Sequence, residues 1–110
     1  MPIPFADKAI VPIEKVTQYL LNVDHPVGGS KAVWFIRCGY RPTDSDTLIN
    51  DLRSIAQSCE EFVEQPFPFG VKYIAVDEVT SPTGIDCEIK TVWKVETGTT
   101  TPRFVTAYPA

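Results

Sequence analysis

The stretch VKYIAVDEVTSPTGIDCEIKTVWKVE, residues 71–96, decides the fold. Its first part is rich in β-branched and aromatic residues, which favour strands, and Ser81–Gly84 places proline and glycine where β-turns use them. Residues 86–96 then alternate between two faces, one mostly apolar and one mostly charged. The pattern predicts two antiparallel strands, Val71–Val79 and Asp86–Glu96, that bury one face and leave the other in water.

A third strand is predicted at residues 103–108, after the polar loop of residues 97–102. Side chains of a regular strand alternate between faces, so Phe104, Thr106 and Tyr108 are expected on one face of this strand. Together with the preceding hairpin, this strand completes an antiparallel meander.

Two helices are predicted ahead of the sheet. The first begins at Pro12, where Ile13, Val16 and Leu20 have helical spacing. The second covers residues 30–38, with Ser30 as N-cap and Gly39 as C-cap. Its apolar centre is also compatible with a buried strand, because short apolar runs do not distinguish the two states.

A third helix is expected from Asp44 to about Val63. Apolar residues recur at helical spacing over this segment, and acidic residues in its first turn favour the helix dipole. Residues 65–70 contain two prolines and a glycine, which are expected to break the helix. The sequence therefore predicts a single α+β domain, residues 1–110. Helices at roughly 12–64 pack on one side of an antiparallel sheet at roughly 70–109.

Composition limits the kind of function. The chain has 110 residues and a net charge of −4, which argues against nonspecific binding to long nucleic acid. The acidic residues concentrate in residues 44–64, whereas between His25 and Pro42 the only charged side chains are three cations: Lys31, Arg37 and Arg41. A local basic cleft on an otherwise acidic molecule is compatible with this distribution.

No cofactor, metal or membrane segment is indicated. The three cysteines, Cys38, Cys59 and Cys87, are widely spaced and are interpreted as reduced, buried thiols rather than as a disulfide or zinc framework. The longest apolar run, Ala32–Ile36, is too short to cross a bilayer, and the N-terminus does not have the pattern of a signal peptide. A cytoplasmic location is the expectation.

Candidate chemistry begins with His25, the only histidine, which can exchange protons near neutral pH. Gly28-Gly29 follows it and leads into a helix N-terminus, where backbone amides can hold an anion. Lys31 lies in the first turn of that helix and is assigned to substrate binding. The structural alternatives are that His25 caps the first helix and that Lys31 is solvated.

The strands supply the other candidates. Arg103, Thr106 and Tyr108 are candidate catalytic residues, and Lys72 and Lys90 are candidate substrate-binding residues. Cations stabilise charge that develops on phosphorus, and a hydroxyl or phenol can orient a phosphate or supply a proton. Alternatively, the lysines protect a sheet edge and the hydroxyl residues are cross-strand packing pairs.

Five motifs, taken together, resemble an uncharacterised bacterial domain family. They are YLLN…HPVGGSKA (19–32), FGVKY (69–73), TSPTGID (80–86), KTVW (90–93) and PRFVTAYP (102–109). Members of this family resemble toxin modules of the barnase, EndoU, colicin and RelE-like ribonuclease superfamily. The resemblance implies a metal-independent endoribonuclease with a cleft on the sheet. Carried over to this sequence, the cleft residues are His25, Lys31, Arg103, Thr106 and Tyr108.

The function expected from the resemblance is RNA cleavage by general acid–base catalysis, with RNA as the substrate and a cognate antitoxin or immunity protein as the partner. Two alternatives stay open at this stage. One is a noncatalytic binding or regulatory module of such a gene pair. The other is a structural adaptor whose acidic third helix binds a basic partner.

Overall fold

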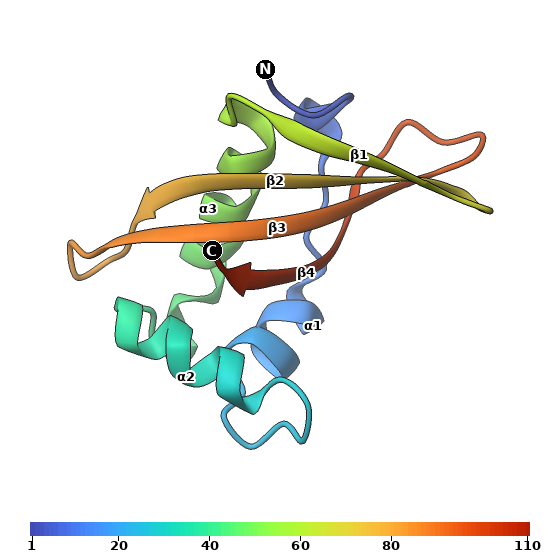
Figure 1. Ribbon diagram of the computed structural model, residues 1–110. Helices are drawn as coiled ribbons and strands as arrows, with labels where there is room; N and C mark the ends of the chain where they lie inside the picture. The colour runs from blue at the N-terminus through green and yellow to red at the C-terminus, as the bar shows by residue number, and fades with distance from the viewer.

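The computed structural model describes all 110 residues, with the helical segments first and the strands afterwards (Figure 1). The helical segments are η1 (Ala6–Lys8), α1 (Ile13–Lys15), the π-helical η2 (Val16–Leu20), α2 (Gly29–Cys38), η3 (Pro42–Asp44) and α3 (Ser45–Ser58). The strands are β1 (Phe62–Phe67), β2 (Gly70–Thr80), β3 (Asp86–Glu96) and β4 (Arg103–Pro109).

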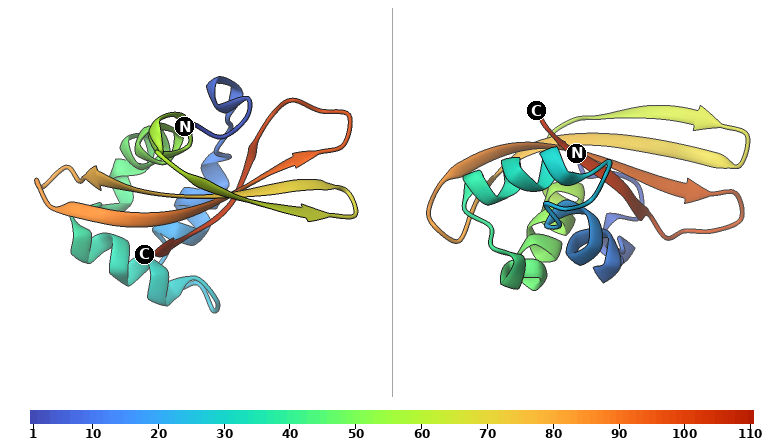
Figure 2. Two further views of the ribbon diagram at one scale, coloured as in Figure 1. Left: turned by 45° about the horizontal axis from the view of Figure 1, so that its top comes forward. Right: turned by 90° about the horizontal axis from the view of Figure 1, so that it is seen from below.

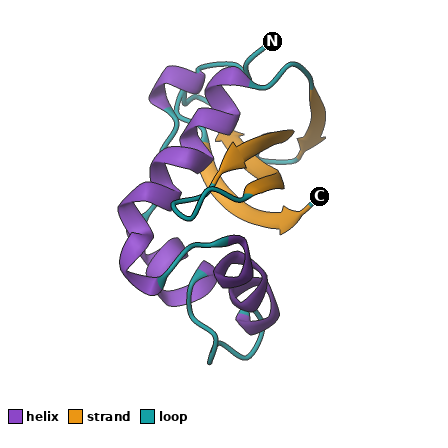
Figure 3. Cartoon of the chain, turned by 90° about the vertical axis from the view of Figure 1, so that its left-hand side faces the viewer, coloured by secondary structure: helices purple, strands orange, loops and turns teal.

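The four strands form one antiparallel sheet in the order β1-β2-β3-β4. The helices gather on one side of this sheet, and the opposite side is open, as the view from below in Figure 2 and the side view in Figure 3 show. The predicted α+β class, with N-terminal helices on a C-terminal antiparallel meander, is confirmed.

The central hairpin has the predicted two-faced pattern. In β3, every second residue from Cys87 to Val95 is buried against the helices, and Trp93 is completely buried. The Trp93 indole N–H donates to Thr91 Oγ1 at 2.8 Å, and Thr91 Oγ1 donates to the Ala75 carbonyl at 2.8 Å. This short relay satisfies the polar atoms of both side chains within the core.

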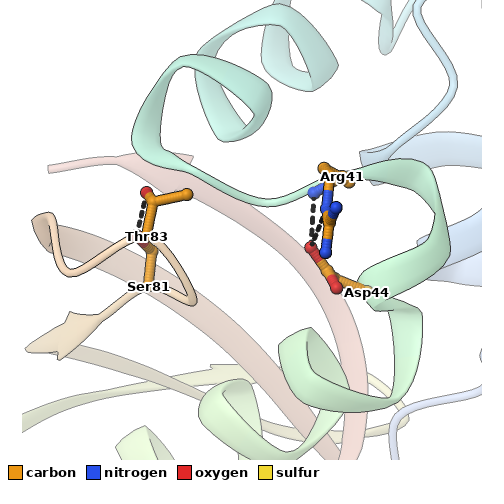
Figure 4. A network of polar contacts seen from close by, with 4 residues as sticks. All are labelled: Arg41, Asp44, Ser81 and Thr83. Atoms are coloured by element: carbon orange, nitrogen blue, oxygen red, sulfur yellow. Dashed lines mark hydrogen bonds and ion pairs between the residues drawn. The ribbon is translucent and has the colours of Figure 1, made fainter.

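The second predicted helix is present as α2, and Gly39 ends it with φ 112. Its N-cap is Gly28 rather than Ser30, so the helix begins two residues earlier than the predicted cap implies. A Cβ at Gly39 would collide with Ser81 and Thr83 in the β2–β3 turn, so glycine is required for this close approach. The hydroxyls of Ser81 and Thr83 lie 3.2 Å apart in this turn. Figure 4 shows this contact and the Arg41–Asp44 pair that precedes α3.

The boundary between the third helix and the sheet was predicted wrongly. Helix α3 ends at Ser58, and residues 62–67, which were assigned to the helix end and to a break, form strand β1. Phe62 continues the apolar spacing of the helix, but its ring packs edge-on against Tyr73 of β2 instead, with ring centroids 5.5 Å apart. Pro66 is tolerated because β1 is an edge strand, where one side of the backbone has no strand partner.

A β-bulge in β4 also departs from the expectation. Trp93 pairs with Phe104 but Val92 pairs with Thr106, so Val105 is an extra residue on β4. The bulge reverses the alternation, and Phe104 therefore lies on the buried face while Thr106 and Tyr108 share the open face with Val92 and Lys90. The prediction that all three lie on one face holds only for the last two.

The start of β4 is held by the N-terminal segment. Ile10 forms a parallel bridge with Arg103, in which the Ile10 N–H donates to the Pro102 carbonyl and the Phe104 N–H donates to the Ile10 carbonyl, both at 2.9 Å. This segment covers one end of the β4 edge. The rest of that edge faces η2 and α2, and the candidate site lies there.

Cys59 and Cys87 are buried, Cys38 is half-buried, and all three are free thiols. No helix has the length and apolar character needed to cross a membrane.

Candidate functional site

A cleft between the α1–η2 segment and β4 contains three of the predicted residues. His25, Arg103 and Thr106 all line it, together with Lys15 and Tyr19, and its volume is about 660 Å³. We call it the His25 cleft. Residues far apart in the sequence meet here because the bridge at Ile10 brings α1 and η2 alongside the last strand. A catalytic role for these side chains is still a prediction.

His25 is half-buried, and one of its ring nitrogens is already occupied. Nδ1 accepts hydrogen bonds from the backbone amides of Val27 at 3.0 Å and Gly28 at 2.9 Å. The neutral ring therefore carries its hydrogen on Nε2. The imidazole ring also packs edge-on against Tyr19, with ring centroids 5.1 Å apart. His25 thus organises the loop that leads into α2 rather than capping the first helix, and it leaves Nε2–H as its free polar group.

The glycine pair has a different role from the one predicted. The Gly28 amide donates to His25 Nδ1 and the Gly29 amide donates to the His25 carbonyl at 3.0 Å, so neither is free to hold an anion. A Cβ at Gly28 would lie 2.6 Å from the Tyr19 ring, and one at Gly29 would lie 2.6 Å from the Val23 carbonyl oxygen. The two glycines are required for close packing of the loop, and their own amides do not supply the predicted anion site.

Lys31 links helix α2 to the open face of β4. Its ammonium donates to Tyr19 Oη at 2.9 Å and to Thr106 Oγ1 at 3.0 Å, and it lies 4.0 Å from the centroid of the Tyr108 ring. Thr106 and Tyr108 therefore both contact the same cation. Of the five residues carried over from the resemblance, Lys31 contacts Thr106 and Tyr108, while Thr106, His25 and Arg103 all line the His25 cleft.

Lys72 and Lys90 lie outside the His25 cleft, on hollows next to it. Both line a hollow on the open face that also contains Thr106 and Tyr108. Lys72 additionally lines a third hollow, which shares Lys15 and Arg103 with the His25 cleft. The predicted substrate-binding lysines thus extend the cationic surface away from the candidate reaction centre.

The charge along β4 contrasts with the charge of the whole chain. Five of the ten lysines and arginines line these three adjoining hollows, and Lys31 contacts their walls. Glu14 is the one carboxylate residue among the lining side chains. This surface therefore attracts anions, although the chain carries a net charge of −4.

Comparison with protein families matches residues 3–110 to the family described as Domain of unknown function (DUF6883). The chain belongs to the DUF6883 family. This confirms the expectation of a family with no assigned function. Comparison with curated proteins finds no match.

The DUF6883 chain also has a similar solved structure. A chain in the structure titled "Contact-dependent growth inhibition toxin - immunity protein complex from Klebsiella pneumoniae 342" superposes with a TM-score of 0.73. The two sequences are 15% identical, and the match covers 96% of each chain. At this identity the likeness shows a shared fold over the whole chain.

Tyr19 is the main residue of this DUF6883 site that the sequence did not reveal. It is half-buried between the His25 ring and the Lys31 ammonium, and the hydrogen bond from Lys31 lowers the pKa of its phenol from the ordinary value of 10.0, against the opposing effect of burial. The sequence signal was weak: Tyr19 lies beside the buried Leu20 on an amphipathic helix, where an exposed tyrosine is unremarkable.

Lys15 was also missed, and it supports the bulge. Its ammonium donates to the carbonyl of Val105 at 3.3 Å, and the side chain lines both the His25 cleft and the hollow beside it. No group of three or more His, Cys, Asp or Glu side chains is close enough to hold a metal ion.

The arrangement offers two kinds of chemistry. The ammonium of Lys31 donates a hydrogen bond to the Tyr19 phenol and lowers its pKa, so the two groups are candidates for proton transfer. Arg103 and Lys15 supply positive charge in the same cleft. Cleavage of an RNA phosphodiester by its own 2′-hydroxyl requires proton transfer, together with cations that face the negatively charged phosphate.

Proposed function

We propose that this chain is a metal-independent endoribonuclease of the bacterial toxin type. The observation that carries the proposal is the His25 cleft, in which His25, Arg103 and Tyr19 line a cationic surface of an acidic protein and Tyr19 accepts a hydrogen bond from the adjacent Lys31. The fold shared with a chain of a toxin–immunity complex supports a toxin-associated role. A cognate immunity or antitoxin protein is the partner we propose.

The reaction is an attack of the 2′-oxygen on the adjacent phosphorus. Tyr19, as phenolate, takes the proton of the 2′-hydroxyl while the new P–O2′ bond forms. The P–O5′ bond breaks, and the leaving 5′-oxygen receives a proton from the Lys31 ammonium. The products are a 2′,3′-cyclic phosphate and a 5′-hydroxyl. Because Tyr19 Oη and Lys31 Nζ are 2.9 Å apart, the phenol can return its proton to the lysine and restore both groups.

The remaining residues act on the phosphate and on Lys31. The Arg103 guanidinium and the Lys15 ammonium stabilise the negative charge that builds up on the phosphorane oxygens. His25 donates from Nε2–H to a phosphate oxygen, because its Nδ1 is held by two backbone amides. Thr106 and the face of the Tyr108 ring position the Lys31 ammonium.

The experiment is to incubate the purified chain with total RNA in excess chelator, beside His25→Ala and His25→Gln variants. We expect the wild-type chain to leave fragments with cyclic phosphate ends and the alanine variant to lose most of this activity. The glutamine side chain has an N–H at a position similar to Nε2–H, so His25→Gln should keep more activity than His25→Ala. Equal loss in both variants would show that His25 carries a proton instead of donating a hydrogen bond.

The control for contamination is a Tyr19→Phe variant purified in the same way. It keeps the ring that packs on His25 and Gly28 but has no ionisable hydroxyl, so it should be nearly inactive while folding normally. Absence of cleavage by the wild-type chain in every buffer, with the chelator omitted and divalent metals added, would reject the proposal.

The second candidate function is a noncatalytic binding module, of the kind an immunity protein represents. The observation that favours it is the net charge of −4, since a negatively charged protein can cover a cationic partner. In that case the wild-type chain cleaves no RNA, and the variants in the His25 cleft leave partner binding unchanged.

A further inference from the structure

The third hollow, next to the His25 cleft, combines an aromatic ring with several cations. We call it the Phe67 pocket. Its volume is about 410 Å³, and its walls include Phe67 from β1, Lys72 from β2, Lys94 from β3 and Arg103 from β4. Lys15 lies across from them on α1. The pocket is thus lined by at least one residue from each strand of the sheet.

The charge of the pocket selects an anion. Four cationic side chains line it and no carboxylate does. Lys94 has one acidic neighbour, Glu96, at 3.4 Å, whereas Lys15, Lys72 and Arg103 form no ion pair. In a chain with four more acidic than basic side chains, a concentration of this kind indicates a site for a negatively charged ligand.

The aromatic ring adds a second recognition element. Phe67 is half-buried, and the Lys72 ammonium lies 5.6 Å from its ring centroid. Phe69, an exposed residue at the tip of the same hairpin, packs edge-on against Phe67 at a centroid distance of 6.3 Å. A ring with cations beside it suits a nucleotide, because the base stacks on the ring while the phosphate meets the cations.

The pocket is also connected to the candidate reaction centre. Arg103 and Lys15 line both the Phe67 pocket and the His25 cleft, so a single RNA strand passing through one enters the other with its backbone between these two cations. A rigid duplex does not expose a base for stacking on Phe67, whereas a single strand does.

We infer that the Phe67 pocket binds one nucleotide of single-stranded RNA that flanks the bond to be cleaved, with the base stacked on Phe67 and its phosphate held by Arg103 and Lys15. The inference rests on the proposed function. Since stacking tolerates every base and no side-chain carboxylate or amide lines the pocket, recognition at this position has little sequence preference.

The test is a binding measurement with a short single-stranded RNA that is 2′-O-methylated throughout and therefore cannot be cleaved. Fluorescence anisotropy with the wild-type chain, Phe67→Ala, Phe67→Leu and Phe69→Ala gives the affinities. Phe67→Ala should bind the RNA about 5- to 150-fold more weakly than the wild-type chain does, because the stacking of one base is lost. Phe67→Leu keeps the apolar volume and the fold but lacks the aromatic face, so it should show most of the same loss. Phe69→Ala is the matched control and should change binding less than Phe67→Leu does.

An oligonucleotide scan completes the test. An RNA with one abasic position should bind the wild-type chain as weakly as the intact RNA binds Phe67→Leu. The Phe67→Leu variant should bind the abasic RNA and the intact RNA with equal affinity. Equal binding by Phe67→Leu and wild type would overturn the inference. So would competition by polyglutamate as strong as that by RNA, since the pocket would then select an acidic protein partner by charge alone.

The outcome is separable from that of the proposed function. If RNA binding depends on Phe67 but unmodified RNA is not cleaved, the nucleotide site is supported and the nuclease proposal is rejected. Cleavage that is insensitive to Phe67→Leu, together with unchanged binding, would reject the nucleotide site and leave the nuclease standing.

Discussion

The two faces of the sheet differ in how their polar groups are paired. On the face covered by helices, Thr91 and Trp93 satisfy each other and the Ala75 carbonyl within a dry core. On the open face, Lys72, Lys90 and Arg103 form no ion pair. The covered face therefore maintains the fold, and the open face leaves these cations available for the anionic ligand that we propose. Variants on one face should therefore change a property that variants on the other leave intact.

The largest effect is expected on the open face. Arg103→Ala should lower RNA cleavage about 100- to 1000-fold, because a cation that faces the developing negative charge is lost. Arg103 is exposed, so the free energy of unfolding should change by less than about 0.5 kcal/mol. Single-turnover cleavage and urea unfolding measure the two properties. Arg37→Ala, which removes an exposed arginine from α2, is the matched control; similar losses in both variants would contradict the assignment.

The covered face should show the opposite behaviour. Thr91→Val removes the hydroxyl that accepts from Trp93, and the buried indole N–H then lacks a partner, at a cost of about 1–3 kcal/mol in the free energy of unfolding. Thr91→Ser retains the hydroxyl and should be the more stable variant. The cleavage rate of the folded fraction should stay at the wild-type value. Wild-type stability of Thr91→Val in a thermal melt would show that the relay is not important for the fold.

Alkaline pH should also act through the covered face. Burial, followed by the neighbouring Cys38 thiol, raises the pKa of Cys87 from 9.0 to about 12. The unfolded chain ionises this thiol first, so stability is retained below pH 9 and is lost progressively as the pH rises from 9 to 12. Urea midpoints across this range should fall less steeply in Cys87→Ala. Identical slopes in the two proteins would argue against a protonated thiol in the core.

The smallest effect is expected from a single peripheral cation on the open face. Lys90→Ala should weaken RNA binding modestly and reduce the slope of log affinity against log salt by about 0.7, which is the contribution of one phosphate contact on a single strand. Lys8→Ala is the control, because Lys8 is exposed in η1 and lines none of the three hollows. A slope altered equally by both variants would mean that binding depends on net charge alone.

Local sequence signals were sufficient for much of the fold. The alternation of residues 86–96 predicted β3 and its buried face, and the glycine at position 39 predicted the end of α2. Strand β1 was missed because Pro66 and Pro68 normally indicate an interruption of regular structure. They are compatible with strand pairing here only because β1 lies at the edge of the sheet.

The residues of the candidate site were harder to predict from the sequence than the fold, because their arrangement depends on tertiary structure. His25, Arg103 and Thr106 could be named from their residue types, but Tyr19 could not, since its phenol becomes unusual only beside Lys31. The bulge at Val105 leaves no mark in the sequence, because it arises from the register between β3 and β4. Without it, alternation along β4 would not place Phe104 in the core and Thr106 on the open face.

The bridge between Ile10 and Arg103 has a consequence for biosynthesis. It joins the first tenth of the chain to the last, and contacts between such distant positions form late in folding because closing a long loop costs entropy. A nascent chain on the ribosome has its helices before it has β4. The cleft is therefore assembled only after translation of the domain is finished.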